Sequence, residues 1–138
     1  MKRWVFTMAV VSWIACPPSA MSAEDPTSPG FGTCSPSAKH AAVPKIRHLV
    51  YGVARKRLLA GDWTPLAKNP ASSDGTAQHF RSKGYREVDA CAMDRPLCRF
   101  DFADSFGNLL LVFTKGEDPP GDWNRQTVSS TRLSCPIK

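Results

Sequence analysis

The sequence predicts an α+β domain in which two N-terminal helices pack on one face of a meander sheet of three or four antiparallel strands, held by two disulfides. Apolar residues recur with a helical period in the first half of the chain and with a period of two in the second half. Helices followed by strands with short links are typical of two-layer α+β domains. Four cysteines outside the leader are enough for two bridges.

Residues 1–23 have the pattern of a secretory signal peptide. A basic start precedes the apolar stretch Trp4–Ala15, and small residues lead to Ala23, so we expect cleavage after Ala23 or Ser22. A lipoprotein site at Cys16 is the alternative. About 12 apolar residues are too few to span a bilayer core of ~30 Å, so we expect no stable membrane insertion. The expected location is therefore the periplasm or the medium.

The rest of the chain divides into a lead-in and one domain. Residues 24–43 are rich in Pro, Gly, Ser and Thr, which predicts an extended lead-in, and 44–138 form the expected single α+β domain. Loss of Lys2 and Arg3 with the leader lowers the formal net charge by two from +6. A mildly basic exported domain is a poor candidate for nucleic-acid recognition.

The four remaining cysteines predict two disulfides, as is usual in small exported domains. Three pairings are possible, and we expect Cys91–Cys98 and Cys34–Cys135. The first closes a short loop with a turn-forming Asp-Arg-Pro at its centre, and the second joins the two ends of the domain. Zinc sites need two close pairs of ligands, whereas the sequence has one close Cys pair. Walker and Rossmann glycine patterns are absent, so neither metal nor cofactor is expected.

The first helix is expected over residues 44–60. Ile46, Leu49, Val50 and Val53 share one face because they are spaced i, i+3, i+4, i+7. The other surface is basic and carries Lys45, Arg47, Arg55, Lys56 and Arg57. Cations in the last turns complement the helix dipole. Alternatively, they form a docking surface for an anionic component of the cell envelope.

A second helix is expected from Ser73 or Asp74 to about Lys83, with Ala77 and Phe80 facing inward. Period-two patterns then predict strands at Tyr85–Cys91, Leu97–Ala103, Leu109–Thr114 and Thr127–Cys135. The third of these is apolar on both faces. This pattern indicates a central strand, or one whose outer face meets a partner, and it allows a homodimer through the sheet.

Catalytic motifs are weak in this sequence. The three histidines, His40, His48 and His79, do not lie beside a Gly-framed Ser, and no G-x-S-x-G occurs. Asp89 and Asp101 fall on strands that we expect to pair, so they could serve as the two carboxylates of a small hydrolase. The favoured interpretation is that they pair across strands with arginines, for which the candidates are Arg86, Arg99 and Arg132. No enzymatic activity and no catalytic residue are therefore expected.

Two loops are better suited to recognition. Residues 92–97 would be clamped by the Cys91–Cys98 bridge, and residues 116–123 would be stiffened by two prolines. The side chains expected to contact a partner are Asp94, Arg95, Glu117, Asp118, Asp122 and Trp123. Rigid loops lose little entropy on binding, and Trp and Arg are favoured anchors. The sequence thus predicts a non-enzymatic protein-binding domain, most specifically an inhibitor or immunity protein that blocks a periplasmic or cell-wall-degrading enzyme.

The segment G-Y-R-E-V-D-A-C through F-D-F-A-D-S-F-G-N-L-L-L-V-F-T-K-G resembles, in its layout, the helix–strand–strand units of small exported bacterial domains. PepSY-type modules and the β-lactamase-inhibitor-like fold are similar in this respect. The resemblance covers residues 84–116 and implies a two-layer arrangement, and no functional residue of either family carries over.

Overall fold

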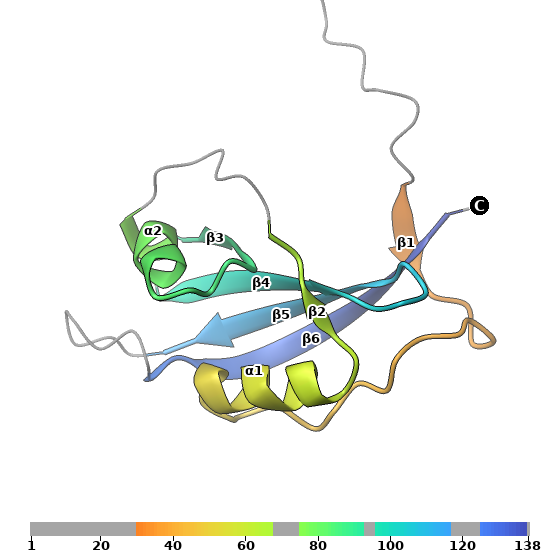
Figure 1. The fold of residues 1–138 in the computed structure, drawn as a ribbon, viewed down its shortest axis with the longest axis horizontal. Helices are drawn as coiled ribbons and strands as arrows, with labels where there is room; N and C mark the ends of the chain where they lie inside the picture. Colours follow the sequence, from red (N-terminus) through yellow and green to blue (C-terminus); the bar gives the residue numbers. More distant parts are fainter. Residues whose placement is uncertain (1–29, 68–74, 93–95, 117–124, 138) are drawn as a thin grey trace, which may run out of the picture.

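A computed structural model describes residues 30–67, 75–92, 96–116 and 125–137. Two helices and a six-stranded antiparallel sheet make up this part of the chain (Figure 1). In chain order the elements are β1 (Phe31–Thr33), α1 (Tyr51–Ala60), β2 (Thr64–Pro65), α2 (Gly75–Ser82), β3 (Val88–Cys91), β4 (Leu97–Ala103), β5 (Leu109–Lys115) and β6 (Thr127–Pro136). The α+β class agrees with the prediction.

The sheet is built around a meander of β3, β4, β5 and β6, to which two short strands are added. β1 pairs with the end of β6, and β2 pairs with the end of β4, beside the stretch of β4 that pairs with β3. The expected count of three or four strands is therefore wrong. The two additional strands have three and two residues, which is too short for an alternating pattern to reveal them.

The core lies between the two helices and one face of the sheet. Phe100 and Phe102 of β4 and Val112 of β5 are fully buried on this face. The ring of Tyr51 in α1 stacks on Phe100 with centroids 3.7 Å apart, and Phe80 in α2 meets the same ring edge to face at 5.2 Å. Because both helices contact Phe100, both cover the same face of the sheet. We call the opposite face the outer face.

The first helix begins later than the sequence predicts, at Tyr51 and not at residue 44. The preceding residues run along β6 instead. The N–H of His48 donates to the carbonyl of Val128 at 2.8 Å, and the N–H of Val128 donates to Leu49 at 2.9 Å. His48 also has a positive φ of 66°. Backbone groups that are bonded to a strand cannot make helical bonds, so the helix starts where this pairing ends.

The buried face of α1 also differs from the predicted one. Tyr51, Ala54 and Leu58 point into the core, whereas Val50 and Val53 are 41 % and 48 % exposed. The inward residues have their own spacing of i, i+3, i+7, which competed with the predicted stripe in the sequence. The second helix fits its prediction better, because its buried residues are Ala77 and Phe80.

Both expected disulfides are present. Cys34–Cys135 joins β1 to β6 across 101 residues of sequence. Cys91 and Cys98 are directly opposite each other in β3 and β4, and their bridge closes the hairpin that contains residues 92–97. Two disulfides are consistent with an extracellular or periplasmic protein.

Candidate functional site

The two loops that the sequence singles out start from the same end of the sheet. Leu97 pairs with Lys115, and Lys115 pairs in turn with Thr127. The N–H of Gly116 donates to the carbonyl of Pro96 at 3.2 Å, which connects the base of one loop directly to the base of the other. We call this region the loop end of the sheet. The fold thus brings together two segments that are about twenty residues apart in the sequence.

A groove of about 480 Å³ opens on the sheet at the loop end. Its lining residues come from β3 and the residue that follows it, and from β4, β5 and β6. They are Ala90, Cys91, Ala92, Leu97, Cys98, Arg99, Phe113, Thr114, Ser129 and Ser130. Arg99, Phe113 and Ser130 are opposite one another on adjacent strands. They alternate with the buried Phe100 and Val112, so they lie on the outer face. The groove therefore combines apolar, hydroxyl and cationic groups.

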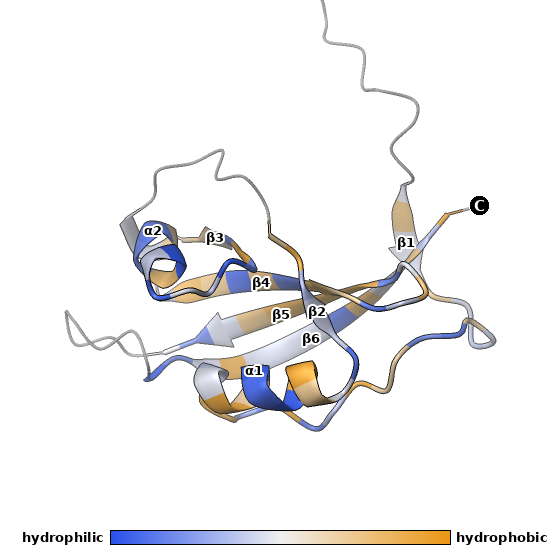
Figure 2. Ribbon diagram, in the orientation of Figure 1, coloured by the Kyte–Doolittle hydropathy of each residue, from blue (hydrophilic) through white to orange (hydrophobic). Residues whose placement is uncertain are grey.

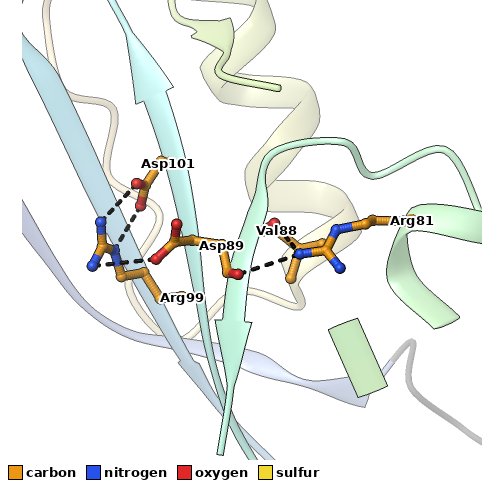
Figure 3. Close-up of polar contacts among 5 residues, drawn as sticks. All are labelled: Arg81, Val88, Asp89, Arg99 and Asp101. Atoms are coloured by element: carbon orange, nitrogen blue, oxygen red, sulfur yellow. Dashed lines mark hydrogen bonds and ion pairs between the residues drawn. The ribbon is translucent and has the colours of Figure 1, made fainter. Parts of the chain in front are cut away.

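A charged cluster borders the groove (Figure 3). Arg99 donates to both carboxylate oxygens of Asp101, from Nε at 2.8 Å and from Nη2 at 2.7 Å. Its Nη1 lies 3.3 Å from Oδ2 of Asp89 on the neighbouring strand. The hydrogen bonds with Asp101, together with the charges of both carboxylates, raise the pKa of Arg99 above its ordinary value despite partial burial. The guanidinium is thus a fixed, permanently charged group at the edge of the groove.

Helix α2 holds Asp89 in place through an arginine. The register of β3 against β4 shifts between Val88 and Ala90, which makes Asp89 the irregular residue of the strand. Nη2 of Arg81 donates to the carbonyls of Val88 and Asp89, both at 3.3 Å (Figure 3). A side chain of α2 therefore bonds the backbone at the shift and fixes the position of the carboxylate that meets Arg99.

The candidate catalytic carboxylates have a different arrangement from the one a hydrolase needs. Asp89 and Asp101 do come together on adjacent strands, but one guanidinium lies between them and binds both. Asp101 is also fully buried. A general acid needs contact with the substrate across a cleft. Arg99 pairs with Asp89 across strands, as the favoured interpretation of the sequence expects, and with Asp101 within β4.

The expected partner-contacting residues lie outside the described part of the chain. This holds for Asp94, Arg95, Glu117, Asp118, Asp122 and Trp123. The structure describes the bases of these two loops and the groove on the strands that carry them. Leu97, Arg99 and Phe113 were missed as site residues. The two-sided apolar pattern of 109–114 was the sequence signal that pointed to Phe113.

The basic residues around the first helix divide into two groups. Arg55 forms an ion pair with the fully buried carboxylate of Glu87, with Nε and Oε1 2.5 Å apart. The hydroxyl of Tyr51 donates to the same oxygen at 2.8 Å. Burial, together with the charge of Glu87, raises the pKa of Tyr51 well above its ordinary value, so this hydroxyl remains a donor. Arg55 is thus structural, whereas no described carboxylate pairs with Lys45, Arg47, Lys56 or Arg57.

Within the ranges that the structure describes, no three His, Cys, Asp or Glu side chains are grouped so that they could hold a metal ion. Comparison with known proteins adds no assignment, because no family model, curated protein or solved structure matches the chain. The function is therefore inferred from the geometry of the chain itself.

Proposed function

We propose that this chain is an exported, non-enzymatic domain that binds another protein through the loop end of its sheet. The observation that carries the proposal is the hydrogen-bonded contact between the bases of the two loops, from Gly116 to Pro96. Two loops that start side by side can contact one partner at the same time. Either loop alone would present too little surface for a specific complex.

The groove supplies the anchoring chemistry that such an interface needs. Leu97 is 39 % exposed, and the half-buried Phe113 is directly opposite Arg99 on the adjacent strand and lines the same groove. Aromatic and arginine side chains dominate the binding energy of protein interfaces when they lie near the centre of the contact. The pairing of Arg99 with Asp89 and Asp101 fixes its orientation before binding, so less side-chain entropy is lost on association.

The proposed partner is an enzyme of the cell envelope, which the domain inhibits. The disulfide Cys91–Cys98 closes the hairpin at one side of the groove, so this loop base is rigid in the absence of a partner. Rigid loops that project from a small scaffold are suited to insertion into an enzyme cleft, because little order has to be gained on binding. The signal-peptide pattern and the two disulfides favour a partner in an oxidising compartment.

An affinity capture tests this proposal. The oxidised protein is immobilised and exposed to an envelope extract of the producing organism at low and at moderate salt, and the retained proteins are identified by mass spectrometry. We expect one enzyme to be retained at both salt concentrations and to lose activity when the free protein is added back. Retention of no protein, or of a protein whose activity is unchanged, would contradict the inhibitor assignment.

Matched variants locate the binding surface. Trp123→Ala and Phe113→Ala should each weaken binding by at least tenfold, which corresponds to about 1.4 kcal/mol and is typical of an interface anchor. The control is Phe106→Ala, because Phe106 is 54 % exposed in the turn between β4 and β5, at the other end of these strands. Equal losses in all three variants would place the contact elsewhere.

A further inference from the structure

The exposed surface around α1 has a composition that the protein-binding proposal does not explain. Half of the large exposed apolar side chains among the described residues lie on this one segment, and they are Val43, Val50, Val53 and Leu59. Figure 2 shows one hydrophilic turn in the middle of α1 with a hydrophobic turn beside it. Isolated apolar residues on a surface are ordinary, but four of them within seventeen residues form a patch.

Four exposed cations share this segment with the half-buried Arg55, and they are Lys45, Arg47, Lys56 and Arg57. No described carboxylate pairs with any of them. Two of the guanidinium groups are nevertheless held by backbone carbonyls. Nη1 of Arg57 donates to Lys45 at 3.0 Å, and Nε of Arg47 donates to Ser129 at 3.1 Å. A carbonyl bond orients the side chain but leaves its positive charge uncompensated.

The geometry of α1 puts the apolar and cationic side chains on one outward surface. The helix buries Tyr51, Ala54 and Leu58 against the sheet. Val53 is followed at i+3 and i+4 by Lys56 and Arg57, so these three side chains project together from the side of the helix that faces away from the core. The bond between Arg57 and the carbonyl of residue 45 brings the preceding segment beside this surface.

We propose that α1 and residues 43–50 form a docking surface for the headgroup layer of an anionic bilayer. Cations attract the negative surface, and apolar side chains between them enter the boundary of the acyl chains. The docking is peripheral, since no helix within the described ranges is long and apolar enough to cross a membrane. The groove lies on the outer face and α1 lies on the opposite face, so both surfaces can be occupied together.

Vesicle co-sedimentation tests the proposal with the full mature chain. One set of vesicles contains zwitterionic phosphatidylcholine alone, and the other contains about a third of the anionic lipid phosphatidylglycerol. We expect the protein to sediment with the anionic vesicles and not with the zwitterionic ones. Binding should weaken as salt is raised, because the attraction between exposed charges is screened beyond ~10 Å at 0.1 M ionic strength.

Variants separate the two parts of the surface. Lys45→Gln and Arg57→Gln should each lower the partition coefficient for anionic vesicles about fivefold. This change corresponds to the binding free energy of about 1 kcal/mol that one cation contributes near the surface. The double variant Val53→Gln with Leu59→Gln should have a lower partition coefficient at every salt concentration, because salt does not screen apolar contacts. Glutamine is a good helix former, and both positions are exposed, so the fold should be kept.

The controls carry the same chemical changes on the outer face. Arg132→Gln removes one exposed cation, and Leu97→Gln removes one exposed apolar side chain. Both should leave vesicle binding unchanged. The proposal is overturned if anionic vesicles do not sediment the protein, or if Arg132→Gln reduces binding as much as Arg57→Gln. Retention on an anionic polysaccharide without any vesicle binding would also overturn it.

Discussion

Asp104 is a single carboxylate that joins three parts of the fold. Its oxygens accept four hydrogen bonds, from the N–H groups of Ala41, Phe106 and Asn108 and from the side-chain amide of Asn108. Burial acts to raise the pKa of Asp104, but these bonds outweigh it, so the pKa lies below its ordinary value. One residue therefore closes the turn between β4 and β5 and attaches the N-terminal segment to it.

Asp104→Asn should reveal this role through the pH dependence of stability. A carboxylate whose pKa is lower in the folded state stabilises the fold above the pKa of the unfolded chain, near 3.9, and this contribution is lost as pH falls through the folded value. We expect the variant to be less stable by about 1–2 kcal/mol at pH 7. The difference should shrink in urea titrations as pH falls below about 4. A difference that is the same at every pH would contradict the assignment.

Glu87 shows why some residues are hard to interpret from the sequence. In the sequence it lies between Arg86 and Val88 in a segment predicted as a strand, and nothing in this pattern marks it as buried. In the structure it lies just before β3, fully buried, where Arg55 and Tyr51 bind it. Both partners lie more than thirty residues away in the chain. A pattern of period two cannot show which polar position has such partners, so the ion pair could not be predicted.

At the scale of the elements, the alternating pattern was the most reliable signal. β4 was predicted with its observed limits, and the alternation of its residues correctly placed Phe100 and Phe102 on one side and Arg99 on the other. The predicted start of the first helix was wrong because residues 46–50 fit a helical period and can also pair with β6. Long-range pairing decided between the two structures, and the sequence around residue 48 carries no sign of it.

The irregularity in β3 gives a prediction about a whole element. Arg81→Met removes the donor that bonds the carbonyls of Val88 and Asp89 but keeps most of the aliphatic stem. We expect a loss of about 1–2 kcal/mol in the free energy of unfolding, together with faster hydrogen exchange in β3. The matched control is Lys83→Met, which removes an exposed cation near the end of the same helix. If both variants behave alike, Arg81 does not hold the strand.

At the scale of the whole molecule, the sequence predicted which cysteines are bonded better than it predicted where the segments lie in the fold. Both cysteine pairs followed from spacing and from the even count. For the candidate site, the two loops could be named from their prolines and cysteines, and the residues expected to contact a partner stay a prediction. The position of the loops at one end of the sheet follows from the antiparallel meander, whereas the contact between their bases depends on the register of β4, β5 and β6. The groove beside Phe113 is a product of the same register.

The two disulfides should contribute unequally to the stability of the whole fold. A bridge restricts the unfolded chain more when it closes a longer loop, and Cys34–Cys135 spans 101 residues whereas Cys91–Cys98 spans seven. On the chain-entropy account, Cys34→Ala with Cys135→Ala should cost about 4–5 kcal/mol, and Cys91→Ala with Cys98→Ala about 2–3 kcal/mol. Urea titrations of the oxidised proteins measure both values. β1 has three residues, and among the described strands it pairs only with β6, so removal of the long bridge should also release β1 and expose its amides to exchange. A larger loss from the short bridge would mean that the hairpin at the loop end, and not the closure of the chain, is the main contribution of the disulfides.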